Sequence, residues 1–161
     1  MATGHLLVGL NGAGKSTLAR AIAADGAVRL SLDAAMRTMH PSLAFDDDRY
    51  GELAERARTL LWSHAVQVLD AGVDVVLDWN CWSAARRARW RDAIVAAGHE
   101  PVLHHVDVTV DVAVERARGR AHAGDPESHV LDERVLRAFV DIFEAPGDER
   151  AEGMRVVVHA G

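Results

Sequence analysis

GLNGAGKSTLARAIA, residues 9–23, is the stretch that decides the fold of this 161-residue chain. The apolar run at residues 5–8 precedes it, as expected of a short buried strand, and residues 17–24 are helix formers with an apolar face. The phosphate-binding pattern G-x-x-x-x-G-K-[ST] is filled by Gly9, Gly14, Lys15 and Ser16. The sequence therefore predicts a strand, a phosphate-binding loop (P-loop) and a helix, in that order.

The chemistry of this loop suits a nucleoside triphosphate with Mg²⁺. Its glycines let backbone N–H groups turn toward phosphate oxygens, and the following helix adds the positive end of its dipole. Lys15, the only lysine of the chain, is predicted to reach the β- and γ-phosphates, and the Ser16 hydroxyl to bind Mg²⁺. The predicted nucleotide-binding residues are Gly9, Asn11, Gly12, Ala13, Gly14, Lys15, Ser16 and Thr17.

Length and composition predict one globular domain over residues 1–161, with 49% hydrophobic and 26% charged residues. We expect a cytoplasmic protein, because no apolar run is long enough for a membrane span and a strand at the N-terminus leaves no room for a signal peptide. The protein is expected to be a monomer or a homodimer. The single cysteine, Cys81, permits no intrachain disulfide. The net charge of −6 disfavours long nucleic acid as a partner.

Two large classes of P-loop protein are excluded by residues that are absent from the sequence. A transporter ATPase needs a longer chain with an LSGGQ-type signature, and no such stretch occurs. A GTPase needs the base-recognition motif N-K-x-D, which cannot be present because Lys15 is the only lysine.

Apolar strand candidates alternate with helical stretches along the chain, which predicts an α/β fold with a parallel sheet. The predicted strands are residues 5–8, 27–32, 73–77, 101–106 and 154–159. The predicted helices are residues 17–24, 50–71, 83–97, 110–118 and 130–143, with a polar loop at 119–128.

Three aspartates are predicted to lie at strand ends, where open α/β sheets bind ligands, and the last of them, Asp107, is interpreted as a turn or cap residue. Asp33 follows the second predicted strand, and it is either a general base for an acceptor hydroxyl or the N-cap of a short helix. Arg37 lies one turn further on and would face the same ligand. Asp78 ends the third predicted strand and is a candidate Mg²⁺ ligand or substrate contact.

Two tryptophans follow Asp78 in the stretch VVLDWNCW. Trp79 and Trp82 form either an aromatic wall for an acceptor or part of the core, and Trp79 is included among the predicted substrate contacts. Cys81 between them has no activating neighbour in the sequence and is interpreted as inert packing.

Two arginine-rich stretches are interpreted differently. Arg118 and Arg120 lead into the polar loop, and a lid over about residues 116–129 would bring them onto the transferring phosphoryl group. The alternative is a solvated helix end. The stretch ARRARWR, with Arg86, Arg87, Arg89 and Arg91, is interpreted as a solvated helix face.

Together, the P-loop, Asp33 and Arg37, the strand-end Asp78 and the arginines at 116–120 resemble the small P-loop kinases related to phage polynucleotide kinase, chloramphenicol phosphotransferase and zeta toxins. The ending VLRAFVDIFEAPGDE also resembles bacterial ATP-binding proteins of this group. The resemblance implies a three-layer αβα sandwich whose five-stranded parallel sheet has the order 2-3-1-4-5. It also implies that Asp33 is the base, Arg37 contacts the acceptor and a lid arginine clamps the phosphates.

We therefore expect an ATP- and Mg²⁺-dependent kinase that transfers the γ-phosphoryl group to a hydroxyl of a small molecule, such as an antibiotic, a nucleoside or a sugar. A polynucleotide 5′-hydroxyl is the alternative acceptor. A nucleotide-binding regulator without turnover and a weak ATPase are the alternatives from other classes.

Overall fold

The computed structural model describes residues 1–123, 133–150 and 152–160, and it describes only the backbone of residues 120–123, 133, 135 and 148. Within these residues the strands are β1 (Thr3–Val8), β2 (Val28–Ser31), β3 (Val75–Asp78), β4 (Glu100–Asp107) and β5 (Arg155–Ala160). The helices are α1 (Lys15–Ala24), α2 (Leu32–Met39), α3 (Tyr50–Asp70), α4 (Ala84–Ala96), α5 (Val110–Ala123) and α6 (Glu133–Asp141), with a 3-10 turn at Asp148–Arg150.

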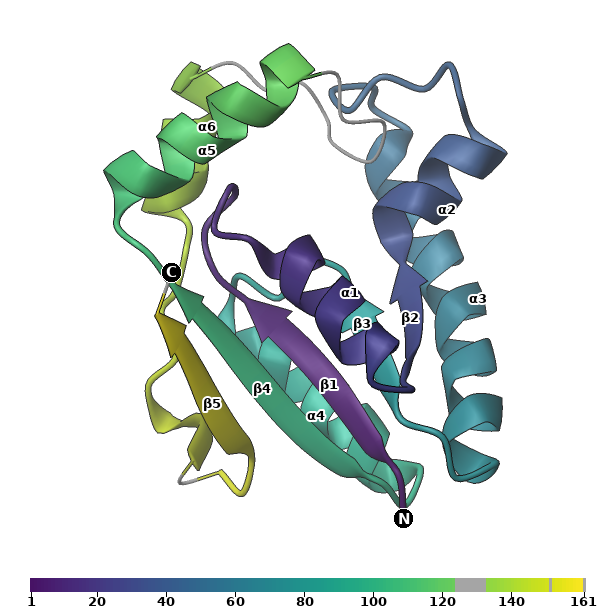
Figure 1. Cartoon of the computed structure of the whole chain (residues 1–161). Helices are drawn as coiled ribbons and strands as arrows, with labels where there is room; N and C mark the ends of the chain where they lie inside the picture. The colour runs from purple at the N-terminus through teal and green to yellow at the C-terminus, as the bar shows by residue number, and fades with distance from the viewer. Residues whose placement is uncertain (124–132, 151, 161) are drawn as a thin grey trace.

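All five strands pair in parallel in the order β2-β3-β1-β4-β5, as predicted (Figure 1). The register places Ser31 of β2 opposite Asp78 of β3, and Val8 of β1 opposite His105 of β4. Because every strand runs in the same direction, all carboxyl ends meet at one edge of the sheet. The P-loop, α2 and the segment after β3 all begin there.

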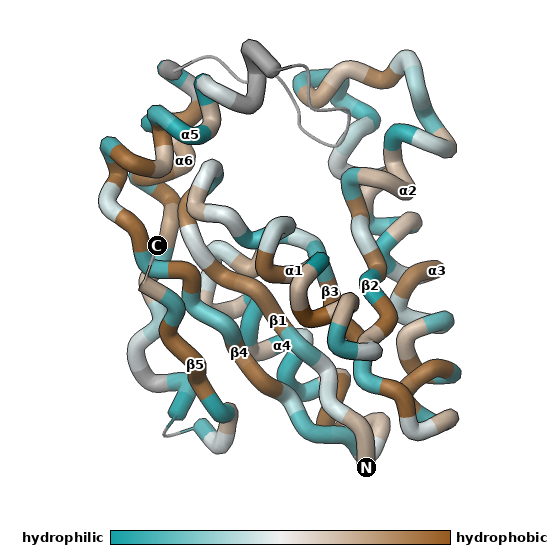
Figure 2. Tube along the Cα trace, viewed as in Figure 1, coloured by the Kyte–Doolittle hydropathy of each residue, from teal (hydrophilic) through white to brown (hydrophobic). Residues whose placement is uncertain are grey.

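Helices cover both faces of the sheet, which makes three layers (Figure 1). On one face, Ala19 of α1 packs against Leu7 of β1 and Val76 of β3. On the other face, Leu69 of α3 and Ile94 of α4 belong to the larger hydrophobic cluster. Residues 6–8 at the carboxyl end of β1 and residues 75–77 of β3 are buried and apolar, so the sheet is the centre of the core, although β4 also carries polar residues in the hydropathy of the trace (Figure 2).

The second strand ends earlier than predicted. β2 stops at Ser31, whose hydroxyl accepts a hydrogen bond from the Ala34 N–H and caps α2. Asp33 therefore lies in the first turn of α2. The interpretation of Asp33 as the N-cap is wrong, because Ser31 fills that position.

The last predicted loop begins later than expected. α5 continues through Gly119 to Ala123, whereas the sequence predicts that the helix stops at residue 118. Glycine inside a helix costs only about 0.5–1 kcal/mol relative to alanine, so the composition of this segment does not end it. α6 begins at Glu133 in the described part of the chain.

The interpretation of ARRARWR as a solvated face is wrong for Arg87. This side chain is only 1% exposed and forms an ion pair with Glu149, with 2.5 Å between Nε and Oε1. Its Nη1 also donates to the carbonyls of Cys81, Trp82 and Glu144. A guanidinium can be buried here because the loop after β3 and the segment after α6 supply acceptors for it.

No helix in the described residues combines the length and the apolar composition that crossing a membrane requires.

Candidate functional site

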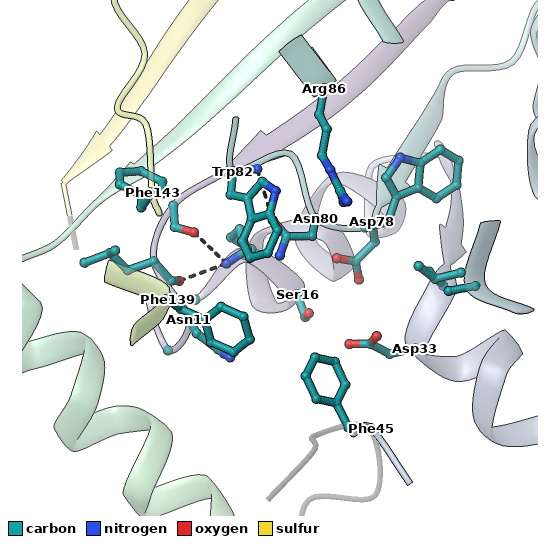
Figure 3. A pocket seen from close by; sticks show the side chains of 18 of the residues that line it. Asn11, Ser16, Asp33, Phe45, Asp78, Asn80, Trp82, Arg86, Phe139 and Phe143 are labelled. Atoms are coloured by element: carbon teal, nitrogen blue, oxygen red, sulfur yellow. Dashed lines mark hydrogen bonds between the residues drawn. The ribbon is translucent and has the colours of Figure 1, made fainter. Parts of the chain in front are cut away.

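A cavity of about 350 Å³ lies at the carboxyl edge of the sheet. It is lined by the P-loop and α1 on one side, and by α2, α3, the segment after β3, α4 and α6 on the others. Figure 3 shows the side chains that point into it, with Ser16, Asp33 and Asp78 directed toward a common space. The predicted phosphate loop and the predicted carboxylates therefore share one cavity.

The P-loop glycines are required by the backbone at two positions. Gly14 caps α1 with φ of +107°, a conformation that side chains other than glycine rarely adopt. Gly12 lies against α5, where an added Cβ would come within 2.0 Å of the Ala113 carbonyl oxygen. The loop can approach this helix so closely only because residue 12 has no side chain.

Lys15 is folded onto its own loop. Its Nζ donates to the carbonyl oxygens of Gly9 and Leu10, each at 2.8 Å. Lys15 also lines the cavity together with Ser16 and Thr17, so an ammonium and two hydroxyls lie where α1 begins. Asn11 lines the same cavity, and the Ala13 N–H donates to the Leu10 carbonyl, which tightens the turn.

The Asp33 side chain lies opposite the P-loop. It is exposed and lines the cavity, and Tyr50 of α3 lines the cavity beside it. Burial raises the pKa of the Tyr50 hydroxyl, and the negative charge of Asp33 raises it further. The two groups are therefore close enough to interact electrostatically, and the phenol stays neutral near neutral pH.

Asp78 is paired with an arginine that sequence reasoning missed. Arg29 of β2 donates to Asp78 Oδ2 from Nη2 at 2.6 Å and from Nε at 2.8 Å. Both bonds reach the same carboxylate oxygen, which leaves Oδ1 outside this pair. A signal was present in the sequence, since Arg29 and Asp78 lie near the ends of strands that become neighbours, but the pairing of the strands decides it.

The cavity provides few protein groups for a metal. Among the described residues, no three His, Cys, Asp or Glu side chains come together as a metal site. Mg²⁺ does not need such a group, because it is usually held by one or two protein oxygens, substrate phosphates and water. The Ser16 hydroxyl and the Asp78 carboxylate, which point into the same space in Figure 3, fit this requirement.

The two tryptophans have different environments. Trp79 is 5% exposed and packs against Trp90 with 4.9 Å between ring centroids, so it belongs mainly to the core, although one side lines the cavity. Trp82 is partly exposed, lines the cavity and lies 5.6 Å from Phe139 of α6. The aromatic wall that the sequence suggested is thus built from Trp82 and aromatic residues of distant segments.

Cys81 is buried, and burial raises the pKa of its thiol to about 12. The thiolate is therefore negligible at neutral pH, in agreement with the interpretation as inert packing.

Some predicted site residues lie away from the cavity. Arg37 is not among the residues that line it, and its Nε and Nη2 are buried without a hydrogen-bond partner in the described part of the chain. Arg118 is exposed on α5 and lines neither the cavity nor the groove behind the P-loop. The side chain of Arg120 and the lid residues 124–129 lie outside the described residues. The roles assigned to these arginines stay predictions.

A second, more open hollow of about 760 Å³ lies between the back of the P-loop and α5. Gly12, Ala13 and Gly14 line one side, and Arg116 and Gly119 of α5 line the other. Arg116 lines this groove and Arg118 does not, because two residues apart on α5 they lie on different faces of the helix.

Sequence reasoning missed several cavity residues. Arg20 lies on α1, next to the P-loop, and the others lie on more distant elements: Phe45, Tyr50, Arg58, Asn80, Arg86, Phe139 and Phe143. Arg86 had been assigned to a solvated face with Arg87, but it is half-buried and lies 5.2 Å above the Trp82 ring. No local motif identifies these residues, because each enters the site only through tertiary packing.

Comparison with known families identifies the domain. The profile of the AAA_33 family, described as an AAA domain, matches residues 5–146. No curated protein matches the chain.

Solved structures with a similar fold include proteins described as kinases. A kinase-like protein from Chloroflexus aurantiacus is 20% identical with a TM-score of 0.75, and the match covers 99% of this chain and 85% of that one. A gluconokinase from Sinorhizobium meliloti is 21% identical with a TM-score of 0.62, covering 98% and 82% of the two chains. A chain of the Pnkp1/Rnl/Hen1 RNA repair complex is 20% identical with a TM-score of 0.71, covering 88% of this chain but 43% of its own length. At such identities the likeness shows the fold.

Proposed function

This chain belongs to the AAA_33 family of AAA domains, and from this premise we propose that it is an ATP- and Mg²⁺-dependent phosphotransferase acting on a hydroxyl of a small molecule. One observation carries the proposal. The P-loop residues Lys15 and Ser16 line the same cavity as Asp33, an arrangement in which a bound phosphoryl donor would face a proton acceptor. The kinase fold of the similar structures supports the same reaction class.

The P-loop would hold the donor. Backbone N–H groups of residues 11–16 and the N-terminus of α1 would bind the phosphate oxygens of ATP. Lys15 would exchange its two carbonyl partners for the β- and γ-phosphates, which offer an ammonium stronger, charge-assisted hydrogen bonds. Ser16 and Asp78 would hold Mg²⁺, which neutralises charge on the phosphates when it is bound.

Asp33 would take the proton of the acceptor. The acceptor oxygen forms a bond to the γ-phosphorus, the bond from that phosphorus to the β–γ bridging oxygen breaks, and ADP leaves with the electron pair. The hydroxyl proton moves to the Asp33 carboxylate and then to water. Asp33 suits this role because it lines the cavity, and because Ser31 rather than Asp33 caps α2.

The shape of the cavity favours a small acceptor. Its volume of about 350 Å³ and its aromatic wall of Trp82 and Phe139 fit a compact molecule with an apolar face. The net charge of −6 disfavours a long polyanion. A polynucleotide 5′-hydroxyl remains the alternative acceptor, because a chain of an RNA repair complex shares the fold. A regulator that binds ATP without turnover is the alternative in which Asp33 has no chemical role.

The Asp33→Asn variant tests the proposal. Asparagine is nearly isosteric and cannot accept the proton, so we expect the rate to fall by about 10²–10⁴-fold while ATP affinity and melting temperature change little. Asp48→Asn is the matched control, because Asp48 is exposed in the segment before α3 and does not line the cavity. Turnover is measured on a panel of hydroxyl compounds, and ATP affinity by calorimetry. Equal rates for wild type and Asp33→Asn would contradict the proposed base, and tight ATP binding with no turnover would favour the regulator.

A further inference from the structure

We propose that the acceptor carries an anionic group, a carboxylate or a phosphate, and that Arg58 of α3 and Arg86 of α4 bind this group. The inference rests on the proposed function, since it concerns the acceptor half of the same cavity. It comes from two guanidinium groups that line the cavity from helices remote from the P-loop and that have too few carboxylate partners.

Arg86 is the first of these groups. Its side chain is half-buried and directed from α4 into the cavity (Figure 3), and its guanidinium carbon lies 5.2 Å from the centroid of the Trp82 ring. Among the described residues, no carboxylate forms a salt bridge with it. Burial lowers the pKa of this guanidinium, and the nearby charge of Arg58 lowers it further. The Glu55 carboxylate acts in the opposite direction, but it already pairs with Arg58 and Arg89, so little negative charge is left for Arg86.

Arg58 is the second group, and it is more deeply buried. Its side chain is 13% exposed, and its Nη1 pairs with Glu55 one turn earlier on α3. Its Nε is buried and has no hydrogen-bond partner in the described part of the chain. Glu55 cannot compensate fully, because it also accepts from Arg89 Nη2 at 2.5 Å. One carboxylate therefore serves two arginines, while Arg86 adds a third positive charge nearby.

The charges of the whole cavity lead to the same conclusion. Four cationic side chains line it, Lys15, Arg20, Arg58 and Arg86, against two carboxylates, Asp33 and Asp78. Arg29 already pairs with Asp78, and the proposed mechanism assigns Lys15 to ATP. The partly buried Arg58 and Arg86 share one nearby carboxylate, Glu55, and a planar guanidinium binds carboxylate or phosphate through short, charge-assisted hydrogen bonds. An anionic group on the acceptor would supply those bonds.

The position of the two arginines also explains how such an acceptor would be oriented. Its anionic end would lie between α3 and α4, its apolar face against Trp82 and Phe139, and its hydroxyl toward Asp33 and the P-loop. Three separate contacts would then fix one hydroxyl for transfer, which is the main requirement of a phosphotransferase.

The first experiment uses sulfate as a probe, because it requires no knowledge of the acceptor. The protein is saturated with ADP and Mg²⁺ so that the P-loop is filled, and the melting temperature is followed with sulfate against chloride at equal ionic strength. We expect a saturable rise for wild type that is lost in Arg86→Gln and retained in Arg56→Gln, which removes the same charge from an exposed position of α3 where it pairs with Glu52. An identical sulfate response in wild type and Arg86→Gln would overturn the proposal. Failure to bind ADP would instead contradict the proposed nucleotide site.

The second experiment compares pairs of acceptors in which one member carries an anionic group and the other a neutral hydroxyl at the same position. Gluconate and sorbitol form the carboxylate pair, and a nucleoside 3′-monophosphate and its nucleoside form the phosphate pair. In the pair that contains the better acceptor, whichever it is, we expect the charged member to have a kcat/KM about 10- to 100-fold higher than that of the neutral member. This is the range that hydrogen bonds to a charged group provide. Arg86→Gln should remove this preference chiefly by raising the acceptor KM, with the KM for ATP unchanged.

Three results would overturn the inference. The first is that, in every pair that reacts, the neutral member reacts as well as its charged partner. The second is an Arg86→Gln variant whose main loss is in ATP affinity, since the arginine would then bind the donor. The third is a strong preference for a 5′-hydroxyl oligonucleotide over the 3′-monophosphate, which would make the acceptor a nucleic acid. If no member of the panel reacts, the sulfate experiment alone decides.

Discussion

The two halves of the cavity are built in different ways. The nucleotide half comes from one continuous stretch, residues 9–17, in which backbone conformation and residue type are specified together. The acceptor half is assembled from α2, α3, the segment after β3, α4 and α6, with residues between Asp33 and Phe143. A short local motif can therefore reveal what donates the phosphoryl group, whereas the acceptor depends on side chains that meet only after folding.

The largest effect is expected in the nucleotide half. Lys15→Ala removes the only lysine of the chain and should lower turnover by about 10³-fold or more, because the charge on the transferring phosphoryl group loses its partner. ATP affinity should fall as well, which calorimetry would measure. Arg20→Ala is the control, since it lines the same cavity from the next turn of α1. Unchanged affinity and rate in Lys15→Ala would remove the P-loop from the mechanism.

A second prediction concerns the scaffold of the acceptor half. Arg87→Met should destabilise the fold by about 3–5 kcal/mol, because Glu149 and three carbonyl groups would lose a buried cation. Arg89→Met on the same helix, whose ion pair is exposed, should cost less than about 1 kcal/mol. Denaturant unfolding of both variants measures the difference, and equal stabilities would show that Arg87 does not hold the wall around Trp82 in place.

A third prediction separates strain from steric conflict within the P-loop. Gly14→Ala meets no atom within 4 Å and should cost about 1–2 kcal/mol for its φ of +107°. Gly12→Ala has a φ of +92° and also collides with the Ala113 carbonyl, so it should cost about 1–3 kcal/mol more. Thermal unfolding compares the two variants. If Gly12→Ala were no worse than Gly14→Ala, α5 would not be packed tightly on the loop.

The smallest effect is expected outside both halves, in a row of histidines on neighbouring strands. His104 of β4 is 8% exposed and lies 2.9 Å from a ring nitrogen of His5 on one side and of His159 on the other. Burial, and after it the positive charges of its two histidine neighbours and Arg155, lowers the pKa of His104 from 6.5 to about 4. The folded state therefore holds this imidazole neutral over a range in which the unfolded chain would protonate it.

The stabilisation from neutral His104 is fully present above pH 6.5 and is lost as the pH falls from 6.5 toward 4, because the unfolded state then binds the extra proton. After allowance for solvent screening, the effect should be on the order of 1 kcal/mol. Melting temperatures of wild type and His104→Asn between pH 7 and pH 4 measure it, with His64→Asn on the exposed face of α3 as the control. A pH dependence that is the same in all three proteins would contradict this assignment. ADP affinity should be unaffected at each pH, which would separate the scaffold from the cavity.

The P-loop, the α/β class and the five parallel strands could be predicted from the sequence alone, and their order from the family resemblance. These features depend on local patterns: apolar runs of strand length, helical periodicity, and glycines where the backbone must turn. Tertiary packing was needed to establish that Ser31 caps α2, that Arg87 is buried and that Trp79 lies mainly in the core while Trp82 stands beside Phe139 in the cavity wall. It also brought Arg58 and Arg86 together. The burial and the partners of a side chain depend on which distant element packs against it, and short-range periodicity carries no information about that choice.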